Sequence, residues 1–323
     1  MLDILGVTSP FFALVGIGYL AARTGALPMA SVPGLNIFVL YFALTAMLFK
    51  LASETPIQQL VDPVVLAVWL GASFVCLALA TATARRGGRS WLDSSFGGMV
   101  SVMSNSGFMG VPLLIALLGA AATGPIGATL LADGIVVQSA AIALSHRGAA
   151  RSGGVLAELG GAMGRVARNP LPWALVLGAL FGMTGLHLPG PVDDVVTMLS
   201  TAASPVALFT IGAVLARAAA DSPPGRVRTG VVAWGDVYWL ATVKLLAHPL
   251  AVWLLGLAAV AAGLPLDPFA LTVLVLVAAL PAAANVSLLA ERFGADNGRV
   301  ARVILVSTVL SFVSFTVAVA LLT

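Results

Sequence analysis

Residues 103–112 read MSNSGFMGVP and lie in the middle of a long apolar segment that covers residues 92–118. Residues 280–287 read LPAAANVS and interrupt a second apolar segment, residues 268–290, in the corresponding half of the chain. A helix in lipid must satisfy its own backbone hydrogen bonds, so a break at membrane depth survives only where protein buries it or where it lines a wet cavity. Two breaks in matching positions are typical of a binding site near the bilayer midplane.

The composition predicts an all-α polytopic membrane protein with very little soluble mass. Of the 323 residues 60% are hydrophobic and 9% are charged, whereas a soluble protein carries about 25% charged residues. A helix needs about 20 apolar residues to cross the hydrocarbon core. Ten segments meet this requirement, at residues 4–22, 34–53, 63–84, 92–118, 124–145, 170–187, 192–216, 233–261, 268–290 and 301–322.

The distribution of charge predicts the orientation of the chain. All fourteen arginines fall at connections on one side of the predicted spans, and the opposite side carries Lys50 with several acidic residues. Under the positive-inside rule the arginine side is cytoplasmic, which places both termini outside the cytoplasm. The compact loops fit a multi-pass protein of the cell inner (plasma) membrane. The basic pI therefore reflects topology, and we expect no nucleic acid partner.

The order of the spans predicts two inverted five-helix repeats. The longest polar stretch, residues 146–169, separates five spans from five, and an odd number in each half forces the halves into opposite orientations. A register of 160 residues places Phe49 on Phe209. We therefore expect a first repeat over residues 1–150, a cytoplasmic linker over residues 151–168 and a second repeat over residues 169–323.

The two breaks contain the candidate substrate-binding residues. Glycine tolerates unusual dihedral angles and proline removes an amide, so the helix is expected to unwind between Asn105 and Pro112. Free amides at half-helix N-termini suit a carboxylate, and asparagine adds a donor and an acceptor. The alternative is a packing kink, because glycine and proline are common in membrane helices. The candidates are Asn105, Ser106, Gly107, Pro112, Pro281 and Asn285.

Three ionisable residues inside predicted spans are candidates for coupling or support. Lys244 lies about 15 Å deep in its span, where an unpaired ammonium is costly, so it either attracts an anion, pairs with a carboxylate or snorkels. Asp133 is the candidate counter-charge, or the carrier of a proton or cation. His248 is either a proton relay or a hydrogen-bonded structural residue. A serine stripe that begins at Ser307 either lines the cavity or packs helices closely.

Catalytic signatures are absent from the sequence. It has no metal-ligand spacing of histidine and cysteine, no nucleophile elbow and no Walker loop, and its one cysteine, Cys76, reads as a buried apolar residue. We therefore expect no enzyme activity, no cofactor and no metal, and we do not expect transport driven by ATP.

Several motifs resemble those of the auxin efflux carrier family, which includes plant auxin exporters and bacterial malonate and malate permeases. Residues 105–112 resemble its fourth-helix signature, residues 244–249 its eighth, residues 280–294 its ninth and residues 307–311 its tenth. The resemblance implies the fold of bile-acid sodium symporters, with helices 4 and 9 crossing at unwound centres. It also implies elevator-like motion against a scaffold. Thr45 departs from the family pattern, which often has proline there, although its repeat mate Pro205 is present.

The resulting hypothesis is a secondary transporter of a small organic carboxylate anion. One alternative is a symporter for another amphipathic solute, coupled to a proton or a sodium ion, in which Asp133 helps hold the cation. Another is a non-transporting membrane sensor, which the short loops disfavour. The expected partners are the carboxylate solute and membrane lipid, and the resemblance allows a homodimer because some relatives dimerise.

Overall fold

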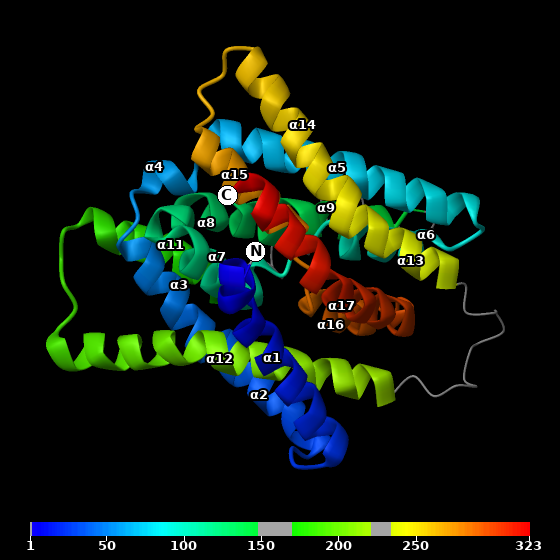
Figure 1. Ribbon diagram of the computed structural model, residues 1–323, viewed down its shortest axis with the longest axis horizontal. Helices are drawn as coiled ribbons and strands as arrows, with labels where there is room; N and C mark the ends of the chain where they lie inside the picture. The colour runs from blue at the N-terminus through cyan, green and yellow to red at the C-terminus, as the bar shows by residue number, and fades with distance from the viewer. Residues whose placement is uncertain (1, 148–169, 221–233) are drawn as a thin grey trace.

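The computed structural model of the protein describes residues 2–147, 170–220 and 234–323, which are helical apart from turns and short connections (Figure 1). The helices of the first half are α1 (Leu2–Thr24), α2 (Val32–Phe38), α3 (Leu44–Ser53), α4 (Ile57–Leu60), α5 (Pro63–Arg86), α6 (Trp91–Val100), α7 (Val111–Leu118), α8 (Thr123–Leu131) and α9 (Gln138–Ser145). Those of the second half are α11 (Pro170–Met183), α12 (Gly190–Ala220), α13 (Trp234–Thr242), α14 (His248–Ala261), α15 (Pro268–Ala279), α16 (Asn285–Phe293) and α17 (Asn297–Leu322). The predicted linker, residues 151–168, lies outside the described residues.

Six helical stretches of the described chain are long and apolar enough to cross a membrane. They are Met29–Ser53, Ile57–Arg86, Ala120–Ser145, Gly190–Arg217, Trp234–Ala261 and Asn297–Leu322. Three further apolar helices are shorter: Ser106–Leu118, Trp173–Met183 and Pro268–Ala279. A multi-pass helical membrane protein is therefore confirmed, whereas ten spans and inverted repeats remain predictions.

One group of helices consists of α1, α2, α3, α11 and α12. In it α12 packs along α1 and α3, and α11 packs on α3 (Figure 1). Glycines bring these backbones together. A Cβ atom at Gly212 would lie 1.9 Å from the carbonyl oxygen of Val15, and one at Gly178 would lie 2.3 Å from that of Phe49. Small residues at such contacts are how membrane helices approach closely, so we call this set the glycine-packed group.

The second group contains both breaks and is built from α5, α6, α7, α8, α9 and α13 to α17. Here α5 packs against α6 and α14, α13 packs against α17, and α14 packs against α15. Trp69 and Phe96 are fully buried in its core. The two groups meet where α12 contacts α17 and the turn that follows the first break. We call this set the break-bearing group.

Four helical stretches of the described chain contain wider, π-helical turns: η2 (Val39–Ala43), η3 (Ser106–Gly110), η5 (Ala132–Val137) and η6 (Val243–Ala247). Such turns are frequent at functional sites because they displace side chains from regular helical positions. Three of them carry residues singled out by the sequence, namely Ser106 in η3, Asp133 in η5 and Lys244 in η6. Three of the four turns therefore carry candidate site residues of the break-bearing group, whereas η2 lies in the glycine-packed group.

Candidate functional site

The first break is shorter and begins earlier than the sequence predicts. α6 ends at Val100, residues 101–105 leave the helix, and helical structure resumes at Ser106. Gly107 lies within η3 and Pro112 in the first turn of α7, so neither residue is itself unwound. A proline there is tolerated because the preceding π-helical turn is wide and the start of a helix does not require its amide.

The two breaks contact each other through their backbones. Ser104 and Ala282 form an antiparallel bridge. The amide of Asn105 donates to the carbonyl of Pro281 at 2.9 Å, and the amide of Ala283 donates to the carbonyl of Met103 at 3.0 Å. Each break thus supplies the hydrogen-bond partners that the other has lost, which satisfies the requirement that lipid cannot meet.

Lys244 holds both breaks with a single ammonium group. Its side chain is fully buried, and its Nζ donates to the Oγ of Ser104 at 2.9 Å and to the carbonyl of Ala278 at 2.6 Å. Ser104 belongs to the first break, and Ala278 lies in the last turn of α15, just before the second. A cation is favourable there because the last carbonyls of a helix lack partners and carry partial negative charge.

Asp133 is buried near Lys244 without touching it. No ion pair within 4.0 Å joins these two described residues, although each acts on the other electrostatically. Instead, the indole Nε1 of Trp69 donates to Oδ1 of Asp133 at 2.8 Å, and the backbone of Ser104 also stabilises the carboxylate. Oδ2 of Asp133 has no hydrogen bond within 3.5 Å among the described residues. The predicted counter-charge is therefore present, but it interacts with Lys244 at a distance.

His248 continues this buried polar cluster. Its Nε2 lies 3.2 Å from the Oγ of Ser73, and its ring packs edge-on against Trp69 with 5.1 Å between ring centroids. Trp69 therefore contacts both Asp133 and His248. This arrangement matches a hydrogen-bonded structural histidine and leaves a relay role as a prediction.

A small pocket lies where the two helix groups meet beside the second break. It is lined by Asn36, Phe108, Thr210, Ile211, Val214, Ala284 and Asn285. About 20 Å³ is open to the centres of water-sized spheres, which is room for about one water molecule. The Oδ1 of Asn285 and the Oγ1 of Thr210 are both buried and have no hydrogen-bond partner among the described residues. Buried polar atoms without a partner are rare, so the pair marks a place where a ligand or a water molecule is expected.

Comparison with known proteins shows the family of the chain. The profile of the family described as "Membrane transport protein" matches residues 6–153 and 154–319. The chain belongs to this family. A protein of Rhizobium meliloti (strain 1021) named "Putative malonate transporter" is 29% identical over 318 residues, which cover 98% of this chain and 95% of the relative. An "Uncharacterized transporter" of Methanothermobacter thermautotrophicus is 28% identical over 314 residues, or 93% and 92% of the two chains. The resemblance to the auxin efflux carrier family is thereby confirmed.

The transporter brings some of the predicted site residues together and separates others. Asn105 is buried, and its backbone is bonded to that of Pro281. Ser106 and Gly107 are buried in the turn that follows. Asn285 lies at the start of α16 and faces the pocket at the group boundary. Lys244, Asp133 and His248 form a buried cluster in the break-bearing group, which reaches the first break through the hydrogen bond from Lys244 to Ser104.

Sequence reasoning missed Asn36, Thr210 and Trp69. Asn36 is a polar residue inside the apolar segment 34–53, and Thr210 directly follows Phe209, which the repeat register had already marked. The sequence therefore contained a signal that Asn36 and Thr210 belong to the site. Trp69 carries no such signal, because an indole in an apolar helix is usually a packing residue. Its role appears only when its Nε1 is seen to meet Asp133.

Ser307 has a role at the second break that neither alternative for the serine stripe included. Its Oγ accepts a hydrogen bond from the amide of Ala282 at 3.1 Å and donates to the carbonyl of Ile304 at 3.0 Å. Ser311 instead donates to the carbonyl of Thr308 within α17. Ser307 therefore helps hold the second break, whereas Ser311 only satisfies its own helix.

Proposed function

We propose that this transporter is a secondary carrier that moves a small organic carboxylate anion across the membrane by elevator-type alternating access. Its membership of a membrane transport family and its full-length similarity to a protein named for malonate transport support this proposal. The chain carries no nucleotide-binding motif, which favours a gradient as the energy source.

The observation that carries the proposal is that two residues with an unpartnered polar atom, Thr210 and Asn285, line the same pocket. Thr210 belongs to the glycine-packed group, and Asn285 belongs to the break-bearing group. A carboxylate held between them would accept from Oγ1 of Thr210 and from Nδ2 of Asn285, while Oδ1 of Asn285, itself an acceptor, would take a hydrogen bond from a water molecule or from a protonated carboxyl group. Asn105, Ser106, Gly107, Pro112 and Pro281 would shape the remaining side of this site, where the two broken segments, residues 92–118 and 268–290, would cross.

The size of the pocket supports a moving mechanism. Room for about one water molecule is too little for a dicarboxylate, so the two helix groups must separate for solute to enter. In our proposal the glycine-packed group is the scaffold, and the break-bearing group slides against it. The protein would lie in the inner membrane with both termini outside the cytoplasm, and the exposed helices of the scaffold would allow a homodimer.

A second candidate is transport coupled to a proton or a sodium ion. Oδ2 of Asp133 is the observation that favours it, because a buried carboxylate oxygen without a partner suits a proton or a cation. Asp133 would then bind the coupling ion, Lys244 would balance the charge when the ion leaves, and His248 would support the cluster through Trp69.

Uptake of radiolabelled malonate by proteoliposomes tests the main proposal, with other mono- and dicarboxylates as competitors. Asn105→Ala and Asn285→Ala should each reduce uptake at least tenfold while the purified protein elutes normally in size exclusion. Thr81→Val is a matched control, since Thr81 is also buried and unpartnered but lies on α5, outside the pocket. Wild-type uptake by both asparagine variants would refute the site.

The same vesicles separate the two candidates. If the carboxylate moves alone, uptake depends on its own gradient and on the membrane potential. If a cation is coupled, an imposed sodium gradient or pH step drives accumulation, and Asp133→Asn abolishes that dependence.

A further inference from the structure

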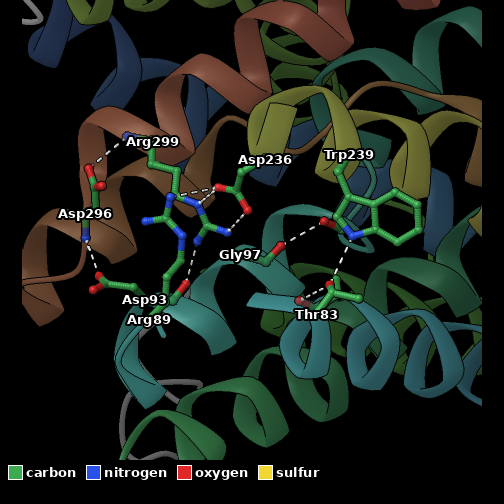
Figure 2. Close-up of polar contacts among 10 residues, drawn as sticks. Thr83, Arg89, Asp93, Gly97, Asp236, Trp239, Asp296 and Arg299 are labelled. Atoms are coloured by element: carbon green, nitrogen blue, oxygen red, sulfur yellow. Dashed lines mark hydrogen bonds and ion pairs between the residues drawn. The ribbon is translucent and has the colours of Figure 1, made fainter. Parts of the chain in front are cut away.

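Arg299 is a buried arginine at the start of α17 that the proposed function leaves unexplained. Its side chain is 3% exposed. Nε donates to Oδ2 of Asp236 at 2.5 Å, and Nη2 donates to Oδ1 of the same carboxylate at 2.9 Å. Nη1 donates to the backbone carbonyl of Asp93 at 2.7 Å. Figure 2 shows the guanidinium enclosed between these two aspartates.

The surrounding contacts tie three helix starts together. The amide of Asp296 donates to Oδ1 of Asp93 at 2.9 Å, and Nη2 of Arg89 lies 3.1 Å from Oδ2 of Asp236 (Figure 2). Asp93 lies in the first turn of α6, Asp236 in that of α13, and Asp296 caps α17. We call Arg89, Asp93, Asp236, Asp296 and Arg299 the arginine clamp.

The local structure makes room for this arginine. A Cβ atom at Gly97 would lie 2.6 Å from Nη1 of Arg299, so α6 approaches the guanidinium more closely than any larger residue permits. A bidentate arginine–carboxylate pair is directional, and a buried pair loses much of its stability when one partner shifts. The clamp therefore fixes the axial positions of α6, α13 and α17 relative to one another.

Each of the three clamped helices leads either to a break or to a side chain that is hydrogen-bonded to one. Lys244 follows Asp236 by eight residues, and Ser307 follows Arg299 by eight residues, which is about 12 Å along each helix. Lys244 bonds Ser104 and the carbonyl of Ala278, and Ser307 bonds the amide of Ala282. α6 runs from the clamp directly into the first break.

We propose that the arginine clamp is a positioning device that sets the geometry of the bridge between Ser104 and Ala282. A shift of one helix start would displace Lys244 or Ser307 with it, because about two turns of hydrogen-bonded helix join each of them to the clamp. The effect of the arginine clamp on transport rests on the function proposed above. Its effect on the bridge between Ser104 and Ala282 does not depend on that function. The clamp residues contact no solute and act only through the breaks.

A cysteine pair across the bridge reads this geometry without any transport assay. Ser104 and Ala282 are a non-hydrogen-bonded antiparallel pair, whose Cα atoms lie about 4.5 Å apart, within the range that a disulfide spans. Ser104→Cys and Ala282→Cys are introduced together with Cys76→Ala, which leaves no other thiol. The rate of disulfide formation in membranes is followed as loss of labelling by a maleimide reagent.

Arg299→Lys, which keeps the charge but loses the bidentate fork, should slow cross-linking about tenfold in protein that remains folded by size exclusion. Arg23→Lys is the control, because Arg23 is an exposed arginine in the last turn of α1, in the glycine-packed group, and should leave the rate unchanged. Arg89→Gln removes a partly exposed clamp member and should slow the reaction two- to threefold even if Arg299→Lys does not fold.

The outcomes decide the two proposals separately. An unchanged rate in folded Arg299→Lys, or in Arg89→Gln if the first variant is lost, overturns the clamp. A slowed rate supports it even if malonate is not a substrate, in which case only the proposed function fails. If malonate is transported, Arg299→Lys should also raise the KM about fivefold, and Arg23→Lys should not.

Discussion

The ammonium of Lys244 donates to the carbonyl oxygen of Ala278 across 2.6 Å, although 34 residues separate the two in sequence. Ala278 lies in the last turn of α15, where helix carbonyls have no partner within the helix. The same ammonium reaches Ser104 in the other break. The buried ammonium thus satisfies a helix-end carbonyl beside the second break and a side-chain hydroxyl in the first.

Lys244→Met should destabilise the folded transporter by roughly 3 kcal/mol, since it leaves the carbonyl of Ala278 without its donor and the charge of Asp133 without a nearby cation. The measurement is the apparent Tm in detergent, which should fall by several degrees.

Lys50→Met is the natural comparison, because Lys50 and Lys244 are the two lysines of the chain. Lys50 lies 3.7 Å from Asp193, and its side chain is 28% exposed. Partly exposed ion pairs contribute about 0–1 kcal/mol, so this change should hardly move the Tm. Equal shifts for the two variants would contradict the role given to Lys244.

Thr210→Val should separate stability from transport. The hydroxyl of Thr210 has no partner among the described residues, so an apolar side chain of the same shape should leave the Tm unchanged or raise it. If the hydroxyl bonds the solute, the KM for malonate should rise about tenfold, the equivalent of about 1.4 kcal/mol. Thr81→Val should share the effect on stability and leave the KM unchanged.

The sequence predicted where the chain breaks better than how it breaks. Membrane-depth interruptions near residues 105 and 281 followed from polar residues and proline inside apolar segments. The extent of the first break did not follow from the sequence, because Gly107 and Gly110 permit unwinding but do not require it. What opens the helix over residues 101–105 is the backbone pairing with the second break, a contact about 180 residues away in sequence.

The partners of the buried charged residues were likewise not predictable from the sequence. That Lys244 and Asp133 need partners follows from their depth, yet which partners they find depends on helix packing. Lys244 meets two neutral oxygens, and Asp133 meets the indole of Trp69. A tryptophan donor and a helix-end carbonyl cannot be read from a one-dimensional pattern, so the sequence offered an ion pair as one of several alternatives and did not indicate these two partners.

Two glycines of one π-helical turn should respond oppositely to alanine. A Cβ atom at Gly110 would lie 2.7 Å from Cδ1 of Leu280, which is fully buried and has little room to move. Gly110→Ala should therefore cost about 1–3 kcal/mol. At Gly107 the nearest atom is 3.7 Å away, so alanine should be neutral or stabilise by up to about 1 kcal/mol.

A double-variant cycle identifies the cause. Leu280→Val removes the atom that the new methyl group would meet, so its combination with Gly110→Ala should be more stable than the sum of the two separate losses in Tm predicts. Simple additivity would show that Gly110 matters for another reason.

Gly212→Ala tests whether the glycine-packed group is a single rigid unit. The added Cβ atom would lie 1.9 Å from the carbonyl oxygen of Val15 and 2.6 Å from the amide nitrogen of Tyr19. Both are backbone atoms, so no side chain can rotate away and α1 must separate from α12. We expect a loss of at least about 3 kcal/mol, with little monodisperse protein recovered after solubilisation.

Gly16→Ala is the control on the facing helix, because a Cβ atom at Gly16 meets nothing within 4 Å. It should behave as wild type in yield, Tm and malonate uptake. If Gly212→Ala is recovered folded and transports normally, α1 and α12 can move apart without consequence. The glycine-packed group could not then serve as a fixed scaffold, because a carrier that slides one group of helices past another needs one of them to hold its shape.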